Sequence, residues 1–340
     1  MHGFGSMLKD YLEFYKISQG DFAERLCITK KHLNNILNGS ANISEELMLA
    51  ISLITDIDVN LIFYVENKKR MYNNLINTFG SEKEIKKYLN KFSLKEMQER
   101  NWITLKDKTS YLENALDLIE YLKISKFENV DNYLEKRILY KKKENADLTK
   151  IYLWIKRCDE LIKEQTPSNY SRNNLFLLLK ELETERTKEF NKERLIKLFN
   201  KYGIYLVIED ALSGTKIRGC TSVKLKNPAI YITTDLKEKA SFYFTLYHEL
   251  SHVKTDYNMA KNKIIINDGD IDLEDNRDKF ALEQMINNKL YKKILLNRKE
   301  EKELCLNNNI PLCFLYSRLA YEGKISYKSK EYLDNREKII

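Results

Sequence analysis

The segment His248-Glu249-Leu250-Ser251-His252 constrains this chain of 340 residues more than any other feature. Its two histidines are four residues apart, so on an α-helix both side chains lie on one face, one turn apart. At that spacing two imidazoles can bind a single metal ion. Glu249 can reach a water on that metal without being a ligand itself. The segment therefore predicts a helix that carries a metal centre.

H-E-x-x-H is the pattern of zinc peptidases, in which two imidazoles bind Zn²⁺ and the glutamate acts as general base. Only four histidines occur in the chain. With so few, roughly 0.007 chance matches to the pattern are expected. We therefore predict His248 and His252 as metal ligands, Glu249 as the catalytic base and Zn²⁺ as the cofactor.

The residues before this segment predict the rest of a small domain. Asp235 and Glu238 are typical of a helix start, and the helix that follows is apolar over much of its surface. Three strand-like runs precede it at 204–208, 215–225 and 229–233, with turn residues at Asn227-Pro228. We expect a small antiparallel sheet whose last strand forms an edge, where an extended peptide could pair.

Composition places the chain among soluble proteins of two or three domains. Hydrophobic residues make up 43% and charged residues 32%, and no apolar run is long enough to span a membrane. The N-terminus does not have the pattern of a signal peptide. The five cysteines are scattered and lack C-x-x-C spacing: Cys27, Cys158, Cys220, Cys305 and Cys313. A reducing cytoplasm is therefore the expected location.

Residues 8–66 predict a set of short helices. Ser18 is typical of an N-cap, Thr29 caps the next helix, and Gly39 ends it. Two short helices joined by a tight turn describe a helix-turn-helix, whose second helix enters the DNA major groove. Lysine can bind phosphate or guanine, and asparagine can pair with adenine. The candidate DNA contacts are Gln19, Lys30, Lys31, Asn34 and Asn35.

The stretch "ISQGDFAERLCITKKHLNNILNGSANISEELMLAISLITDIDVNLIFYVENKKR" resembles the XRE-type helix-turn-helix of HigA-like antidote regulators. The resemblance covers about 60 residues. It implies double-stranded DNA as a partner, and a homodimer through the N-terminal domain as a candidate assembly. Residues 1–70 carry eight basic and nine acidic residues, a net charge of −1. A helical domain that binds protein is therefore the alternative.

Residues 71–190 predict a helical connector, because apolar residues recur there at three- and four-residue steps. Trp102 and Trp154 are expected in its core. Lys141-Lys142-Lys143-Glu144 is typical of an exposed loop or helix end, and the polar run 165–174 is typical of a break between domains.

A catalytic zinc needs a third protein ligand besides the two histidines. His2 and His32 lie far away in the sequence, so a carboxylate or a cysteine is required. The acidic candidates are Asp268, Asp270, Asp272, Glu274, Asp275 and Asp278. Their spacing lacks the sixth-position glycine of an EF-hand calcium loop. Glu274 and Asp278 are four apart on one helical face, so one can bind zinc while the other orients a ligand histidine.

The run "YGIYLVIEDALSGTKIRGCTSVKLKNPAIYITTDLKEKASFYFTLYHELSHV", followed by "LEDNRDKFA", resembles the ImmA/IrrE family of metallopeptidases. In that family the helix after the motif reads E-x-x-A-[N/D]-x-F-A, and its first glutamate is the third zinc ligand. The resemblance implies Glu274 as that ligand and leaves Asp278 for the second shell. Arg277 stands where the family has alanine, so Asp272, Asp275 and Asp278 stay open as alternative ligands.

The expected fold is mainly α with a small antiparallel sheet (α+β). Its parts are a helix-turn-helix domain (1–70), a helical connector (71–190), a zincin-like peptidase domain (191–290) and a C-terminal helical extension (291–340). The resemblance implies an endopeptidase that cleaves a specific regulatory protein, often a helix-turn-helix repressor, to control a mobile element or a stress response. The alternative is a HigA-like transcriptional regulator or antitoxin whose peptidase-like domain senses or binds a partner. A structural zinc site is disfavoured, because such sites usually carry four protein ligands, often Cys.

Overall fold

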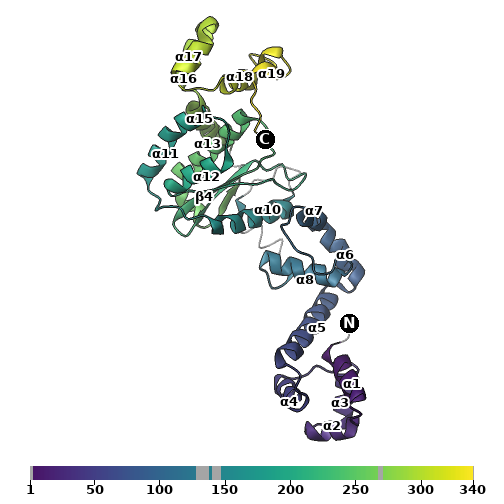
Figure 1. Cartoon of the computed structure of the whole chain (residues 1–340). Helices are drawn as coiled ribbons and strands as arrows, with labels where there is room; N and C mark the ends of the chain where they lie inside the picture. Colours follow the sequence, from purple (N-terminus) through teal and green to yellow (C-terminus); the bar gives the residue numbers. More distant parts are fainter. Residues whose placement is uncertain (1–2, 128–137, 140–146, 267–270, 340) are drawn as a thin grey trace. The chain divides into compact units, whose positions relative to one another are not determined.

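Residues 3–127, 138–139, 147–266 and 271–339 are described by a computed structural model, with the backbone alone at 138–139, 266 and 271–275. The chain forms two units (Figure 1). The N-terminal unit comprises Met1–Lys91 and Ile103–Tyr121, and the C-terminal unit comprises Phe92–Trp102 and Leu122–Ile340. The fold is mainly α with one small mixed sheet. The finer four-domain division stays a prediction, and its first boundary, at residue 70, falls inside a helix.

Short capped helices build the N-terminal unit. The side chains of Ser18, Thr29 and Ser44 each accept a hydrogen bond from a backbone N–H in the first turn of the helix that follows, as predicted. Leu33, Met48 and other apolar side chains between Phe4 and Ile62 form one buried core. The helices are α1 (Phe4–Phe14), α2 (Gln19–Arg25), α3 (Lys30–Leu37), α4 (Glu45–Thr55), α5 (Val59–Phe79), α6 (Glu82–Leu89) and α8 (Tyr111–Leu122).

The predicted connector is mostly helical, but it also contributes strand β1 (Ile138–Leu139) to the sheet. Trp102 and Trp154 are buried as predicted, and both indole N–H groups donate to Glu209, to its side chain and its backbone carbonyl respectively. The predicted loop at 141–144 lies outside the described residues. The helices here are η1 (Asn90–Phe92), α7 (Leu94–Glu99), α10 (Leu148–Leu161), η3 (Ile162–Glu164) and α11 (Arg172–Glu185).

The sheet of the C-terminal unit is mixed, so the prediction of an antiparallel sheet was wrong. Its strands are β2 (Tyr205–Ile208), β3 (Gly219–Lys224), β4 (Asn227–Ile232) and β5 (Ile264–Ile266), in the order β1-β5-β3-β4-β2. Strand β3 is antiparallel to β4 and β5, whereas β2 runs parallel to β4 and β1 parallel to β5. The long connection from β2 to β4, which passes through β3, allows the parallel pairing that a direct hairpin excludes.

Strand β4, which directly precedes the helix with the histidines, is an interior strand. It pairs with β3 on one side and β2 on the other, so the prediction of an open edge there was wrong. Asn227 and Pro228, predicted as a turn, belong to β4 and pair with Lys224 and Val223. Pairing on both sides satisfies the backbone groups that an edge strand would offer to a peptide.

Helix α13 (Lys239–Thr255) contributes many side chains to a core cluster of the C-terminal unit. It begins four residues after the predicted N-cap Asp235, and Glu238 occupies the N-cap position without a side-chain cap hydrogen bond. The surrounding helices are α12 (Lys192–Lys201), α14 (Tyr257–Ala260), α15 (Ile271–Met285), α16 (Asn288–Leu296), η4 (Arg298–Glu300), α17 (Glu301–Asn307), α18 (Leu312–Tyr321) and α19 (Lys330–Asn335). Figure 1 shows α12, α13 and β4 gathered in this unit.

Gly203 joins α12 to β2 at a point where no side chain fits. Its φ is +80°, in the left-handed region that favours glycine, and a Cβ there would lie 2.6 Å from the backbone of Tyr170.

Among the helices of the described part of the chain, none combines the length and the apolar character that crossing a membrane requires.

Candidate metal centre and nucleic-acid interface

Helix α13 carries the candidate metal centre in the interior of the C-terminal unit. Strands β3 and β4 and helices α15 and α18 pack against it, because its side chains are apolar on several faces. His248, Glu249 and His252 are at most 1% exposed. Burying polar groups so completely is costly unless each has a partner, so their contacts indicate what the site is built for.

Each histidine is oriented by a carboxylate. Nδ1 of His248 lies 2.9 Å from Oδ1 of Asp278, and Nδ1 of His252 lies 2.8 Å from Oδ2 of Asp256. An ionised carboxylate only accepts hydrogen bonds, so each Nδ1 is the donor and each Nε2 keeps a lone pair. Carboxylates on Nδ1 and a lone pair on Nε2 are the usual arrangement of histidines that bind metals.

The surroundings of the Nε2 atom of His252 indicate whether a metal ion fits this site. It is buried and has no hydrogen-bond partner among the residues that the structure describes. A buried nitrogen of this kind is explained if its lone pair binds a ligand. The two imidazole rings have centroids 5.1 Å apart, as expected for side chains one helical turn apart. The histidines therefore fit a metal ion by their donor atoms and their tautomers.

Arg277 and Asp256 form an ion pair behind His252. Nη2 of Arg277 lies 2.7 Å and its Nε 3.2 Å from Oδ2 of Asp256, the oxygen that also contacts His252. Burial alone would raise the pKa of Asp256, but the hydrogen bonds from His252 and Arg277 outweigh that effect and lower it to about 2. Arg277 thus stabilises the carboxylate that contacts His252.

The sequence analysis missed Asp256, although a signal for it exists. Asp256 follows His252 by four residues, a spacing that brings side chains together on a helix. Its ion pair with Arg277 spans 21 residues, and nothing local indicates it.

The side chain of Glu249 contacts strand β3. The hydroxyl of Thr221 donates to its Oε2 at 2.6 Å. Gly219 leaves room for the same carboxylate, since a Cβ there would lie 2.8 Å from Oε1. Neither Thr221 nor Gly219 is visible as a site residue in the sequence, because β3 reaches Glu249 only after the sheet has formed.

Among the described side chains, no group of three His, Cys, Asp or Glu residues surrounds a common point. The predicted ligand Glu274 and its alternatives Asp272 and Asp275 lie on α15, with side chains outside the described residues, and Asp268 and Asp270 lie outside them entirely. The backbone of Glu274 is one turn before Asp278, which contacts His248. Glu274 as a ligand stays a prediction.

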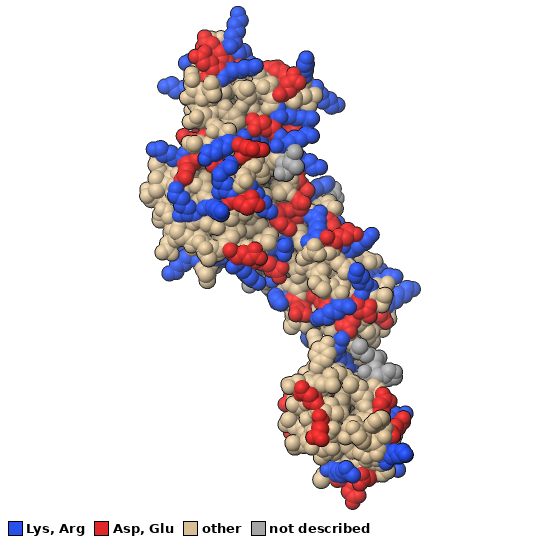
Figure 2. All heavy atoms as spheres, in the orientation of Figure 1, with Lys and Arg blue, Asp and Glu red and all other residues tan. Residues whose placement is uncertain are grey.

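The candidate DNA contacts lie at the surface of the N-terminal unit. Lys30, Lys31 and Asn34 on α3 are exposed, while Asn35 on α3 and Gln19 on α2 are half-buried. Helix α3 packs through Leu33, Ile36 and Leu37 against the core, so its polar face is turned outwards. On the face of the molecule in Figure 2, Lys and Arg are interspersed with Asp and Glu. The candidate contacts are therefore a few polar and basic side chains on α2 and α3.

Comparison with known families agrees with this geometry in the N-terminal unit. Residues 8–62 match the family model of the helix-turn-helix domain. The chain therefore has an N-terminal XRE-type helix-turn-helix domain, which suggests DNA binding and transcriptional regulation. Comparisons with curated proteins and with solved structures return no match.

Replacing Thr221 by Val should lower the free energy of unfolding by about 1.5–3 kcal/mol, because the buried carboxylate of Glu249 loses a hydrogen bond. Thr221→Ser keeps the hydroxyl and should retain most of the stability. The measurement is urea unfolding of the full chain, followed by circular dichroism. Equal losses for Val and Ser would show that the hydroxyl does not stabilise Glu249.

Proposed function

We propose that this protein is a zinc-dependent endopeptidase joined to a DNA-binding helix-turn-helix domain. The observation that carries the proposal is the pair of buried histidines, each with a carboxylate on Nδ1, on the helix that also carries Glu249. A structural zinc site would usually present four ligands, often cysteines. All five cysteines are free thiols, and four of them are buried.

The chain's own residues divide the work of peptide hydrolysis. His248 and His252 would hold the metal through Nε2, with Glu274 as the predicted third ligand. When bound, Zn²⁺ supplies a Lewis acid that activates water and polarises the scissile carbonyl. Glu249 takes the proton of the attacking water and passes it to the leaving amine. Asp256 and Asp278 keep the imidazoles in the binding tautomer.

The proposed substrate is a regulatory protein. The resemblance of residues 202–253 to ImmA/IrrE metallopeptidases implies cleavage of a specific protein, often a helix-turn-helix repressor. A DNA-binding domain on the same chain would bring the peptidase to the sites that such a repressor occupies. Cleavage there would release the genes of a mobile element or a stress response.

Glu249→Gln should keep the zinc content of the purified protein and reduce substrate cleavage at least ~100-fold, because an amide cannot act as general base. Zinc is measured by elemental analysis, and cleavage by co-expression with the repressor encoded beside the gene. Glu193→Gln, at an exposed position on α12, is the matched control and should cleave normally. Full cleavage by the Glu249 variant would remove that residue from the mechanism.

Asp256→Asn should weaken zinc binding about 10- to 100-fold, because the amide orients the His252 ring less well than the carboxylate does. Competition with a chromophoric chelator measures the affinity, and circular dichroism checks that the variant is folded. Asp334→Asn, an exposed change of equal charge on α19, should bind zinc like the wild type. Unchanged zinc affinity in the Asp256 variant would contradict the proposed metal centre.

The second candidate function is a transcriptional regulator whose C-terminal unit senses a signal or binds a partner. The match of residues 8–62 to the helix-turn-helix family favours it. The two functions differ in what Glu249→Gln does to a promoter that the protein controls. Equal regulation by the variant and the wild type favours the regulator, and loss of regulation favours the peptidase.

Lys30→Ala combined with Lys31→Ala should weaken DNA binding. The slope of log affinity against log salt concentration should also fall by the amount expected for the loss of about two phosphate contacts. Neither lysine has an ion pair within the described part of the chain, so both are available to phosphate. Binding to a duplex from upstream of the gene is followed by fluorescence anisotropy between low and moderate salt. Lys299→Ala with Lys302→Ala, the same charge change on the C-terminal unit, is the control. An unchanged salt slope in the Lys30/Lys31 variant would favour the protein-binding alternative.

A further inference from the structure

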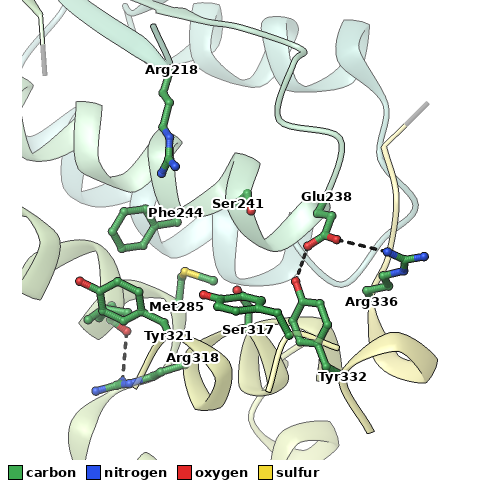
Figure 3. Close-up of a pocket in the computed structure, with 12 residues that line it drawn as sticks. Arg218, Glu238, Ser241, Phe244, Met285, Ser317, Arg318, Tyr321, Tyr332 and Arg336 are labelled. Carbon is green, nitrogen blue, oxygen red and sulfur yellow. Dashed lines mark hydrogen bonds and ion pairs between the residues drawn. The ribbon is translucent and has the colours of Figure 1, made fainter. Parts of the chain in front are cut away.

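A cavity of about 490 Å³ lies beside helix α13 in the C-terminal unit (Figure 3). Its volume falls within the range of ~300–1,000 Å³ that is typical of small-ligand sites. The residues around it are Arg218, Glu238, Ser241, Phe244, Leu282, Met285, Ser317, Arg318, Tyr321, Tyr327, Tyr332 and Arg336. They come from the segment before β3, from α13 and α15, and from the last 25 residues of the chain.

The cavity continues along the helix face that carries the histidines. Ser241 and Phe244 precede His248 by seven and four residues, so all three lie on one face of α13. The ring of Phe244 is 6.5 Å from that of His248, centroid to centroid. A group bound in the cavity therefore lies about one helical turn from the first histidine.

The C-terminal residues form one wall of the cavity and are tied to the start of α13. The backbone N–H of Lys239 donates to the carbonyl of Glu337 at 2.8 Å, and that of Ile339 donates to Lys237 at 3.0 Å. Tyr332 donates through its hydroxyl to Glu238. These bonds hold the aromatic wall in place, and Tyr321 within it remains 60% exposed.

The charges around the cavity are paired except at Arg218. Glu238 pairs with Arg336 at 3.9 Å, as the dashed line in Figure 3 marks. Arg318 is held by Glu322 at 3.0 Å and by the carbonyl of Ile286 at 2.7 Å. The side chain of Arg218 makes no hydrogen bond or ion pair with any residue that the structure describes.

Figure 3 shows the Arg218 guanidinium pointing from the β3 side towards Phe244, with Tyr321 and Tyr332 across the cavity. An unpaired guanidinium above apolar and aromatic walls is suited to a carboxylate on an apolar body. The guanidinium can bind both carboxylate oxygens, and the rings cover the rest of the group.

We propose that this cavity binds a carboxylate carried on an apolar or aromatic group, with Arg218 as its partner. If the proposed peptidase function holds, the carboxylate belongs to the substrate segment beside the scissile bond. Arg218 then selects substrates with an acidic residue at that position. The pocket is assembled from α13 and the C-terminal extension, so the extension takes part in substrate recognition.

The first test measures binding of 4-phenylbutyrate and of its neutral amide to the full-length protein by isothermal titration calorimetry. The wild type should prefer the acid by about ten-fold, as a charge-assisted hydrogen bond predicts. Arg218→Ala should lose this preference and Arg218→Lys should keep part of it. Lys237→Ala, an exposed charge change outside the cavity lining, should retain it fully. A carboxylate held elsewhere, for example by a metal, would keep its preference in Arg218→Ala.

Equal affinities of the wild type for acid and amide, or an unchanged preference in Arg218→Ala, would overturn the proposal. The proposal would also be overturned if neither compound bound at about 10 mM, a concentration at which a ligand with a millimolar Kd would still be detected.

The second test separates the sources of the carboxylate and uses a proteome-derived peptide mixture analysed by mass spectrometry. The same digestion with Glu249→Gln gives the background cleavage, which is subtracted. Enrichment of Glu or Asp next to the cleaved bond, lost in Arg218→Ala, assigns the carboxylate to the substrate. Cleavage without enrichment, together with 4-phenylbutyrate binding, supports the pocket with a free small carboxylate as its ligand. Binding without any cleavage supports the pocket and contradicts the peptidase function.

Discussion

The C-terminal unit depends on how two buried imidazoles are paired. Helix α13 is enclosed by strands and helices, so His248 and His252 have lost nearly all contact with water. An unpaired polar group in that position would cost about 1–3 kcal/mol. The carboxylates of Asp278 and Asp256 remove this cost on the Nδ1 side. Because carboxylates accept only, they also determine which nitrogen of each ring keeps its lone pair.

Helix α15 supports both histidines at once. Asp278 contacts His248 directly, and Arg277, its neighbour in sequence, reaches His252 through Asp256. The guanidinium of Arg277 pairs with a partly buried carboxylate that already accepts a hydrogen bond from His252, so this side chain adds an ion pair to the site.

The short helices of the helix-turn-helix domain and helix α13 were predictable because their sequence signals are local. Ser18, Thr29 and Ser44 cap their own helices within three residues, and this geometry is contained in each short segment. The two histidines share a helix face because they are four residues apart. The predicted N-cap Asp235 lies three residues before the observed N-cap Glu238. The contact that holds Glu238 there comes from Tyr332, 94 residues later.

The amino-acid sequence by itself determined the short capped helices, the buried helix α13 and the spacing of His248, Glu249 and His252 along it. Tertiary structure alone decided that β4 is interior, that Thr221 and Gly219 of β3 meet Glu249, and that the C-terminal residues wall a cavity beside His248. The physical reason is the range of the interactions. Caps and helical faces involve residues three or four apart, whereas strand order and ion pairs between helices join segments that only packing brings together.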